Sequence, residues 1–522
     1  MTDRNSIVIV GGGHNGLVCA AYLAKAGRQV TVLEAADRVG GASVTREFAP
    51  GFRVSACAHL SYLLDARIAR ELGLAGHGLK TARANLRTVA LAGEGEHLVL
   101  NGGQVEAGAL PANDPQALAG YHANLLKFAR VIGRQHNRKP PRIAAGGRSE
   151  LLGAAAIGFD IRRLGRDPMR EFLRIVGINI FDVLEETFES PLLKGALALD
   201  AVLGANLGVR SNNSVLNLLH RMSGAATGVA GGLSLPEGGM GSIGEALAKA
   251  ARAAGATIRT GAAVARISLN GDRVAGVELE NGEKIAAGTV VSNADPARTL
   301  LDLLGARHLE TGIVHRLRHF RAKGMSAKLH LALDALPAFS RLKAELAGER
   351  LVVAPDPGYI ESAFDCAKYG ECSTHPALEI TMPSVHDRSV APPGKHVLSA
   401  VVQYAPFDAR ASGDAARSAF LERTLDVLER YAPGLRRQIV ASEMLLPADI
   451  EREFRITGGH WHHGEFALDQ MLMLRPVPGA AQYTTPVPGL YLCGAGCHPG
   501  GGVMGSAGRN AARALLGAER AA

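Results

Sequence analysis

The chain begins with an apolar run that ends in glycines. Residues 7–10 are β-branched and carry no polar side chain, as expected of a parallel strand that is covered on both faces. A helical pattern follows over 17–26, Gly27 ends it, and a second apolar strand covers 29–33. The order of strand, glycine loop, helix and strand predicts a βαβ unit at the start of a parallel sheet.

Further strand patterns occur far from this unit. Residues 256–259, 264–269 and 274–279 predict three strands, and Asn270-Gly271 marks a tight turn between the last two. Near the end of the chain, 489–493 predict another strand, which leads into a glycine-rich loop and then a helix from about residue 503. Both ends of the chain therefore carry strand, glycine loop and helix patterns, and we expect them to build one site.

The remaining segments have a different character. Residues 76–230 show a helical pattern with irregular interruptions and broad apolar stripes, which suit a core or the lining of a lipophilic tunnel. Residues 325–333 predict a strand in which Lys328 alternates with apolar neighbours, pointing to solvent or into the site. We predict two interleaved domains. The first comprises 1–75, 231–296 and 441–522, and the second, a substrate domain, comprises 76–230 and 297–440.

The glycines after the first strand fit a dinucleotide-binding loop. Gly11, Gly13 and Gly16 match G-x-G-x-x-G: they allow a sharp turn, close approach of a pyrophosphate and close packing of the following helix. Glu34, at the tip of the second strand, is placed to accept hydrogen bonds from ribose hydroxyls and would repel a 2′-phosphate. NADP is thus disfavoured, and NAD or FAD remains. The same pattern recurs at 239–244 and 500–505, but without the βαβ context.

Arg38, Gly40 and Gly41 favour FAD over NAD. They resemble the R-x-G-G element of flavoproteins of the glutathione reductase fold, in which this turn contacts the FAD pyrophosphate. The fold class that we predict is therefore α/β, a glutathione-reductase-like FAD-binding Rossmann domain interleaved with an α+β substrate domain. The residues expected to contact FAD are Gly11, Gly13, His14, Asn15, Gly16, Glu34, Ala35, Arg38, Gly40, Gly41, Ala42, Ser43, Val264, Gly494, Gly502, Val503 and Met504.

Composition narrows the class of protein. The 522 residues, 47% hydrophobic with 63 glycines, suit a turn-rich α/β protein with large cores. The net charge of +8 is spread over the chain without a Lys/Arg block of nucleic-acid type, so we expect no nucleic-acid partner, although anionic membranes remain compatible. The six cysteines contain no C-x-x-C pair, which argues against a redox dithiol. With no apolar run of about 18 residues and no signal-like N-terminus, we expect a cytoplasmic protein.

The segment 458–470, GGHWHHGEFALDQ, carries the densest candidate chemistry. Three histidines, the single tryptophan and Glu465 fall within six residues. A metal is disfavoured because the spacing offers no clear third ligand, so we expect none. A histidine oriented by a carboxylate suits proton transfer beside a flavin, which makes His462, His463 and Glu465 candidate catalytic residues; a loop that only hydrogen-bonds FAD is the alternative.

Two further features carry weaker signals. His59 lies in the apolar stretch 48–64 and could reach the flavin, but a lone buried histidine is more often only hydrogen-bonded. The basic cluster 316–323 is most simply a solvated face, and a peripheral membrane contact is the alternative. The oligomeric state is left open, with a homodimer among the options.

The N-terminal motif and the segments 367–407, 458–470 and 475–512 together resemble the phytoene-dehydrogenase-like flavoproteins. Within these, they resemble the subgroup called pyridine nucleotide-disulphide oxidoreductase domain-containing protein 2. The resemblance implies FAD as sole cofactor and oxidation or desaturation of an apolar substrate. His463, Glu465, Asp469 and Gln470 fall on the subgroup's pattern. In related flavin oxidases a lysine of the substrate domain holds a water near flavin N5, which makes Lys328 a further catalytic candidate.

We therefore expect an FAD-dependent oxidoreductase that moves hydride from a C–H bond of a lipophilic or aromatic substrate to flavin N5, with reoxidation by oxygen or a quinone. One alternative uses reduced FAD for redox-neutral hydration or isomerisation of an alkene. Another is a non-catalytic binding or assembly role on the same fold. A simple amine oxidase is disfavoured because the sequence shows no evident aromatic pair to enclose an amine.

Overall fold

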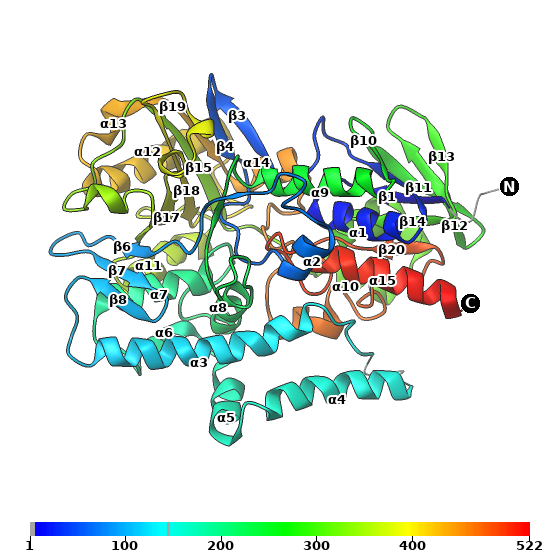
Figure 1. The fold of residues 1–522 in the computed structure, drawn as a ribbon, viewed down its shortest axis with the longest axis horizontal. Helices are drawn as coiled ribbons and strands as arrows, with labels where there is room; N and C mark the ends of the chain where they lie inside the picture. The colour runs from blue at the N-terminus through cyan, green and yellow to red at the C-terminus, as the bar shows by residue number, and fades with distance from the viewer. Residues whose placement is uncertain (1–5, 143–146, 522) are drawn as a thin grey trace.

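The first apolar run, β1 (Ser6–Val10), is the central strand of a five-stranded parallel sheet (Figure 1). The structure is a computed structural model that describes residues 6–142 and 147–521. The strand order is β10-β2-β1-β14-β20, with β10 Thr257–Arg259, β2 Gln29–Leu33, β14 Thr289–Ser292 and β20 Leu490–Leu492. Val10 lies beside Leu33 and Ser292, so the residues that follow these strands meet at one edge of the sheet.

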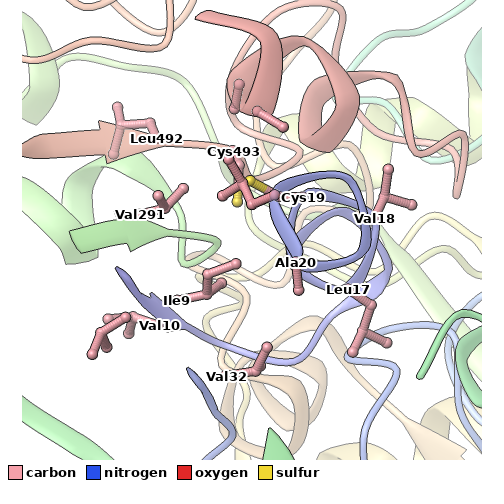
Figure 2. Close-up of a cluster of buried hydrophobic side chains, with 14 of the residues drawn as sticks. Ile9, Val10, Leu17, Val18, Cys19, Ala20, Val32, Val291, Leu492 and Cys493 are labelled. Carbon is pink, nitrogen blue, oxygen red and sulfur yellow. The ribbon is translucent and has the colours of Figure 1, made fainter. Parts of the chain in front are cut away.

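Three helices pack side by side on one face of this sheet, namely α1 (His14–Lys25), α9 (Gly241–Ala253) and α15 (Ser506–Ala521). Figure 2 shows the packing of α1, whose Leu17, Val18 and Ala20 belong to the same buried cluster as Ile9 and Leu492. The predicted helix over 17–26 is confirmed and begins earlier, at His14. Because α15 runs along α1, the first and last helices of the chain lie side by side (Figure 1).

A three-stranded antiparallel sheet packs on the opposite face of the parallel sheet. It contains β11 (Val264–Asn270), β12 (Arg273–Leu279) and β13 (Lys284–Ala286), and the turn predicted at Asn270-Gly271 joins the first two. The N–H of Ala262, just before β11, donates to the carbonyl of Glu34 at 2.8 Å. This bond holds the start of the small sheet against the end of β2.

The second large sheet has eight strands and forms the other half of the molecule. Its order is β19-β15-β18-β17-β16-β6-β7-β8, with β19 Ile439–Leu445, β15 Ser326–Leu333, β18 His396–Gln403, β17 Ala377–Thr381, β16 Arg350–Val353, β6 Thr88–Ala90, β7 Leu98–Asn101 and β8 Gln104–Ala107. The boundary that we placed at residue 440 falls inside β19. Because β19 pairs along β15, strand pairing extends this sheet to Leu445.

This sheet is covered on both faces, as the alternation along β16 shows. Val352 belongs to a cluster with one group of helices, whereas Leu351 and Val353 belong to a cluster on the opposite face. The first group contains α3 (Asp114–Gln135), α6 (Ile180–Glu185), α7 (Pro191–Val202), α8 (Ser214–Met222) and α11 (Pro357–Lys368), and the opposite face is covered by α12 (Gly413–Tyr431).

Several shorter elements complete the fold. They are α2 Ala66–Glu71, α10 Thr311–Arg318, α13 Leu435–Gln438, α14 Pro447–Phe454 and the strand pairs β3 Thr45–Ala49 with β4 Phe52–Ser55 and β5 Thr81–Arg83 with β9 Leu235–Pro236. Two helices, α4 (Arg148–Arg162) and α5 (Arg166–Ile175), lie at the base of the molecule outside α3 (Figure 1). The predicted α/β fold class is confirmed. Among the helices of 6–142 and 147–521, none has the length and apolar character needed to cross a bilayer.

Candidate active site

A cavity lies where the first glycine loop, the last glycine loop and the histidine-rich segment meet. Residues from both halves of the molecule line it: His14, Ala42, Cys57, Ala58, His59, Leu60, Tyr62, Arg221, Glu379, Trp461, His462, His463, Ala495, Gly502 and Val503. Segments from positions 14 and 503 thus converge on one site, as the sequence predicts.

The two N-terminal glycine motifs pack directly on each other. The N–H of Gly40 donates to the carbonyl of Gly12 at 2.9 Å, and Gly13 forms a parallel bridge with Gly40. A Cβ on Gly16 would lie 2.3 Å from the carbonyl oxygen of Gly11, so only glycine lets α1 begin this close to β1. Both motifs therefore present bare backbone at one place, which fits a pyrophosphate.

Glu34 is held at the tip of β2 by the glycine loop. Its carboxylate accepts hydrogen bonds from the N–H of Gly12 at 2.6 Å and from the N–H of Ala36, across Ala35, at 2.9 Å. A carboxylate has about four lone-pair sites, so Glu34 keeps acceptor capacity for ribose hydroxyls. The predicted adenine contact of Val264, which opens β11 and is buried, stays a prediction.

Arg38 and Ser43, two residues of the R-x-G-G segment that we expected to contact FAD, bond to other protein groups in the structure. The Arg38 side chain pairs with Asp37 at 2.9 Å and is half-exposed. The hydroxyl of Ser43 donates to the carbonyl of Met240 at 2.6 Å and so anchors the start of α9. Ala42, in contrast, lines the cavity. The motif contributes backbone, whereas its polar side chains serve the packing around it.

The C-terminal loop is fixed against the N-terminal unit. A Cβ on Gly508 would lie 2.0 Å from the carbonyl oxygen of Asn15, and a Cβ on Gly494 would lie 2.4 Å from that of Asn293. The N–H of Asp65 donates to the carbonyl of Met504 at 3.1 Å, and Val503 has a positive φ of 55°. These close approaches place the loop over the N-terminus of α1.

In the histidine-rich segment, the carboxylate pairs with a different histidine from the expected ones. Glu465 Oε1 lies 2.9 Å from His460 Nε2 and accepts a hydrogen bond from the N–H of Asn206 at 2.7 Å. Among the described residues, no hydrogen bond joins Glu465 to His462 or His463. The expected pairing of Glu465 with these histidines is therefore wrong, because the loop turns at His463 (φ 52°) and folds His460 back onto the carboxylate.

A buried arginine holds this loop in shape. Arg475 donates to the carbonyl oxygens of His462 at 2.6 Å, Glu465 at 3.2 Å and Gln470 at 3.3 Å. Burial lowers the pKa of its guanidinium to about 10, which leaves it charged at neutral pH. Burial and this charge lower the pKa of His463 to about 3, and burial also lowers that of His14 to about 3. Both rings are neutral at physiological pH.

Polar atoms without a partner surround the cavity. Among the described residues, buried nitrogen or oxygen atoms lack a hydrogen-bond partner on the side chains of His14, Asn15, His59, Trp461, His462, His463 and Glu465. Buried polar groups are normally satisfied, so such a concentration marks a place for a ligand. These atoms, the bare glycine backbone and Glu34 fit FAD together with a substrate.

Lys328 points into the protein beside the cavity. It is fully buried, and its Nζ shares a hydrogen bond with His59 Nδ1. Burial lowers the pKa of Lys328 to about 7, so the amine is neutral in a large fraction of molecules near neutral pH. The other ring nitrogen of His59, Nε2, has no hydrogen-bond partner among the described residues and lies 4.0 Å from Glu379.

Sequence reasoning missed a buried ionic network in the cavity wall. Arg221 contacts Glu379 at 2.5 Å and Asp200 at 3.1 Å, and Arg350 contacts Glu379 at 2.6 Å. Burial alone would raise the pKa of Glu379, but the two arginines lower it to about 2. The available signal was a lone carboxylate in the apolar strand 377–381, ALEIT.

All six cysteines are free, and burial raises the pKa of Cys497 in the last loop to about 12, so its thiol stays protonated. Within residues 6–142 and 147–521, no group of three or more His, Cys, Asp or Glu side chains is arranged to hold a metal ion.

Comparison with known proteins is consistent with this site. A family described as flavin containing amine oxidoreductase matches residues 16–516. The chain is 35% identical to pyridine nucleotide-disulfide oxidoreductase domain-containing protein 2 of Mus musculus over 98% of this chain and 93% of that protein. It is 26% identical to the lycopene-forming phytoene desaturase of Pantoea ananas over 97% and 98%. Cyclohexylamine oxidase from Brevibacterium oxydans IH-35A shares the fold, with a TM-score of 0.58, 15% identity and 99% coverage of both chains.

Proposed function

Because this chain belongs to the family of flavin-containing amine oxidoreductases, with FAD as its cofactor, we propose that it is a dehydrogenase of an apolar or aromatic substrate. FAD bound in the cavity supplies the acceptor for a hydride from a substrate C–H bond, with oxygen or a quinone as the final acceptor. The observation that carries this proposal is the group of unpartnered buried atoms at the point where both glycine loops meet the substrate half of the molecule.

The substrate class is inferred from a neighbouring cavity of about 160 Å³. Arg221 lines both this cavity and the cavity of the candidate active site, so the two cavities are adjacent. About half of the lining residues are aliphatic: Leu86, Leu100, Leu118, Leu125, Ala196, Leu197, Leu218, Met222, Val229 and Leu233. Polar and charged side chains, among them Tyr121, His122, Asp200, Arg221 and Arg350, also line it. The aliphatic part of this lining favours an apolar body. The phytoene desaturase relative, whose name describes desaturation of a polyene, agrees with this class.

An amine substrate is less well supported. Tyr62 and Trp461 both line the cavity, an aromatic pair that was not evident in the sequence. However, the Arg221 guanidinium stacks on the Tyr62 ring at 4.9 Å from its centroid. A cation already occupies this aromatic face and would repel an ammonium group.

Lys328 and His59 are the pair that we assign to proton transfer. When neutral Lys328 accepts the Nδ1–H of His59, the Nε2 atom presents a lone pair to the cavity. Nε2 then takes a substrate proton as Nδ1 passes its own to Lys328, and His59 stays neutral, in keeping with its lowered pKa in this buried site. His463 is a weaker base because its pKa is about 3.

The test is anaerobic reduction of the purified holoprotein. Polyenes, other lipids, aromatic compounds and amines are added separately, and the visible band of oxidised flavin is followed. Bleaching by apolar compounds supports the proposal, and bleaching by amines alone contradicts the substrate class. Turnover of an alkene only after prereduction, without use of an acceptor, identifies redox-neutral chemistry. A colourless protein that takes up no FAD on reconstitution identifies a binding role.

A further inference from the structure

The outer face of α4 exposes large apolar side chains at the base of the molecule (Figure 1). Leu151, Leu152 and Phe159 are 73%, 70% and 61% exposed, and Leu173 on the adjacent α5 is 56% exposed. The described residues contain nine strongly exposed large apolar side chains, and these two helices carry four of them. Single exposed leucines are ordinary, but a contiguous group on one helix indicates a binding surface.

Arginines flank this apolar group at both ends of the helix. Arg148, Leu152, Ala155, Phe159 and Arg162 follow a spacing of three or four residues, which places them on one helical face. The next arginines, Arg163 and Arg166, are also exposed. Within the part of the chain that the structure describes, Arg148, Arg162, Arg163 and Arg166 take part in no ion pair. Their charges are therefore available to a partner.

The acidic side chains of α4 face the other way. Asp160 is buried and accepts from Arg134 at 3.0 Å and from Arg138 at 2.5 Å, and Glu150 accepts from Gln482 at 3.0 Å. The two faces of α4 thus differ in charge. The carboxylates contact the body of the protein, and the charged groups of the outer face are all cations. This arrangement is complementary to an anionic surface with an apolar interior.

A second observation adds to the positive charge. A cavity of about 800 Å³ lies beneath α4, between its inner face and α15. Four cations are among the described residues that line it: Arg138 pairs with Asp160 and Lys139 with Glu150, whereas Arg142 and Arg513 take part in no ion pair within the described part of the chain. The unpaired Arg142 and Arg513 thus add positive charge on the side of α4 that faces the body of the protein.

We propose that α4 is an interfacial helix that docks the protein on an anionic phospholipid bilayer. Leu152 and Phe159 enter the region between headgroups and acyl chains, and Arg148, Arg162, Arg163 and Arg166 contact the headgroup phosphates. A second copy of the chain fits this face poorly, because contact through α4 brings like charges together. The basic cluster 316–323 is a weaker docking site, since Arg321 pairs with Asp469 and Lys323 with Asp408, both at 2.6 Å.

Vesicle flotation tests this inference with the FAD-loaded, full-length protein and without turnover, so its result is independent of the proposed function. We expect binding to vesicles of phosphatidylcholine with phosphatidylglycerol, and weak binding to phosphatidylcholine alone. The double variant L152S/F159S should weaken partitioning at least about tenfold. The triple variant R162Q/R163Q/R166Q should weaken it by about fivefold per arginine, mainly at low salt. Flavin absorbance and melting temperature check that each variant is folded.

Val440→Ser is the matched control, because Val440 is 58% exposed on β19, at the opposite side of the molecule in Figure 1. It should bind vesicles like the unmodified protein. An equal loss in this control, or no binding of the unmodified protein to anionic vesicles, overturns the proposal. The proposal is also overturned if the protein does not bind vesicles but forms a dimer in solution that the L152S/F159S substitutions dissociate. That result would identify α4 as a subunit interface.

Discussion

Glu379 forms ion pairs with two buried arginines from different elements of the fold. It lies in the apolar strand β17 and contacts Arg221, which comes from helix α8, and Arg350 on the neighbouring strand β16. Two buried guanidinium groups are tolerable here because Glu379 and Asp200 compensate them. The network joins the wall of the flavin cavity to the large sheet.

We expect Glu379→Gln to lower stability by about 3–5 kcal/mol, since it leaves Arg221 and Arg350 undercompensated. The folded-state pKa of about 2 lies below the ordinary value of 4.5, so this stabilisation is present above pH 4.5 and is lost as the pH falls towards 2. Thermal melts between these pH values should show a smaller acid effect in the variant. Glu94→Gln, at an exposed position, is the control and should melt like the unmodified protein.

Lys328 gives a prediction about rate. If the neutral amine accepts a proton through His59, the rate of flavin reduction by substrate should rise with pH through about 7. Lys328→Met should lower this rate by about a hundredfold and flatten the profile. Lys194→Met, which removes a buried lysine paired with Glu185 away from the cavity, should keep the rise. An unchanged profile in Lys328→Met would assign the titration to another group.

Residues of the site could be located from sequence only where the signal is local. Gly11, Gly13 and Gly16 were found because their spacing occurs between an apolar strand and a helix that leads into a second strand. Arg221 and Glu379 were missed because they are 158 positions apart and only the fold brings them together. Glu465 was identified but given the wrong histidine, since His460, His462 and His463 are nearly equivalent in sequence and the backbone turn at His463 selects among them.

At the scale of elements, close backbone contacts decide how the two ends of the chain meet. Helix α15 can lie against the start of α1 because Gly508 has no side chain there. The strands of the FAD half were predictable from their short apolar runs and turn dipeptides. The extent of β19 was not, because its pairing with β15 depends on a partner more than a hundred positions away.

Gly508→Ala should separate α15 from α1, because its Cβ would lie 2.0 Å from the Asn15 carbonyl oxygen. We expect a loss of about 1–3 kcal/mol in stability and weaker FAD retention, measured by melting and by flavin release on dilution. Gly517→Ala is the matched control in the same helix, where an added Cβ meets no atom within 4 Å. It should retain FAD and gain about 1 kcal/mol from helix propensity.

At the scale of the whole molecule, the motif-based resemblance to phytoene-dehydrogenase-like flavoproteins is confirmed by the mouse relative and by the Pantoea ananas phytoene desaturase. The cofactor site joins segments from the two ends of the chain with a substrate half inserted between them. The predicted domain ranges stay a prediction. The exposed face of α4 could not be predicted, because exposure depends on which helical face the tertiary fold covers.

Removal of FAD should loosen both ends of the chain together. At a thousandfold excess of FAD over its dissociation constant, binding adds about 4 kcal/mol of stability. We expect limited proteolysis of the apoprotein to cut first near the two glycine loops, around 38–43 and 494–503, with α12 protected in both forms. Apoprotein that is cut first within α12 would contradict this expectation.

The sheet order has a consequence for biosynthesis. The sheet around β1 is complete only when β14 and then β20 have been synthesised. Strand β20 follows β1 by some 480 residues, so roughly 25–100 s pass between the synthesis of these two strands at ordinary elongation rates. During this interval the apolar face of α1 that α15 finally covers is open to water. This face of the nascent chain is therefore an aggregation-prone surface until the last helix emerges.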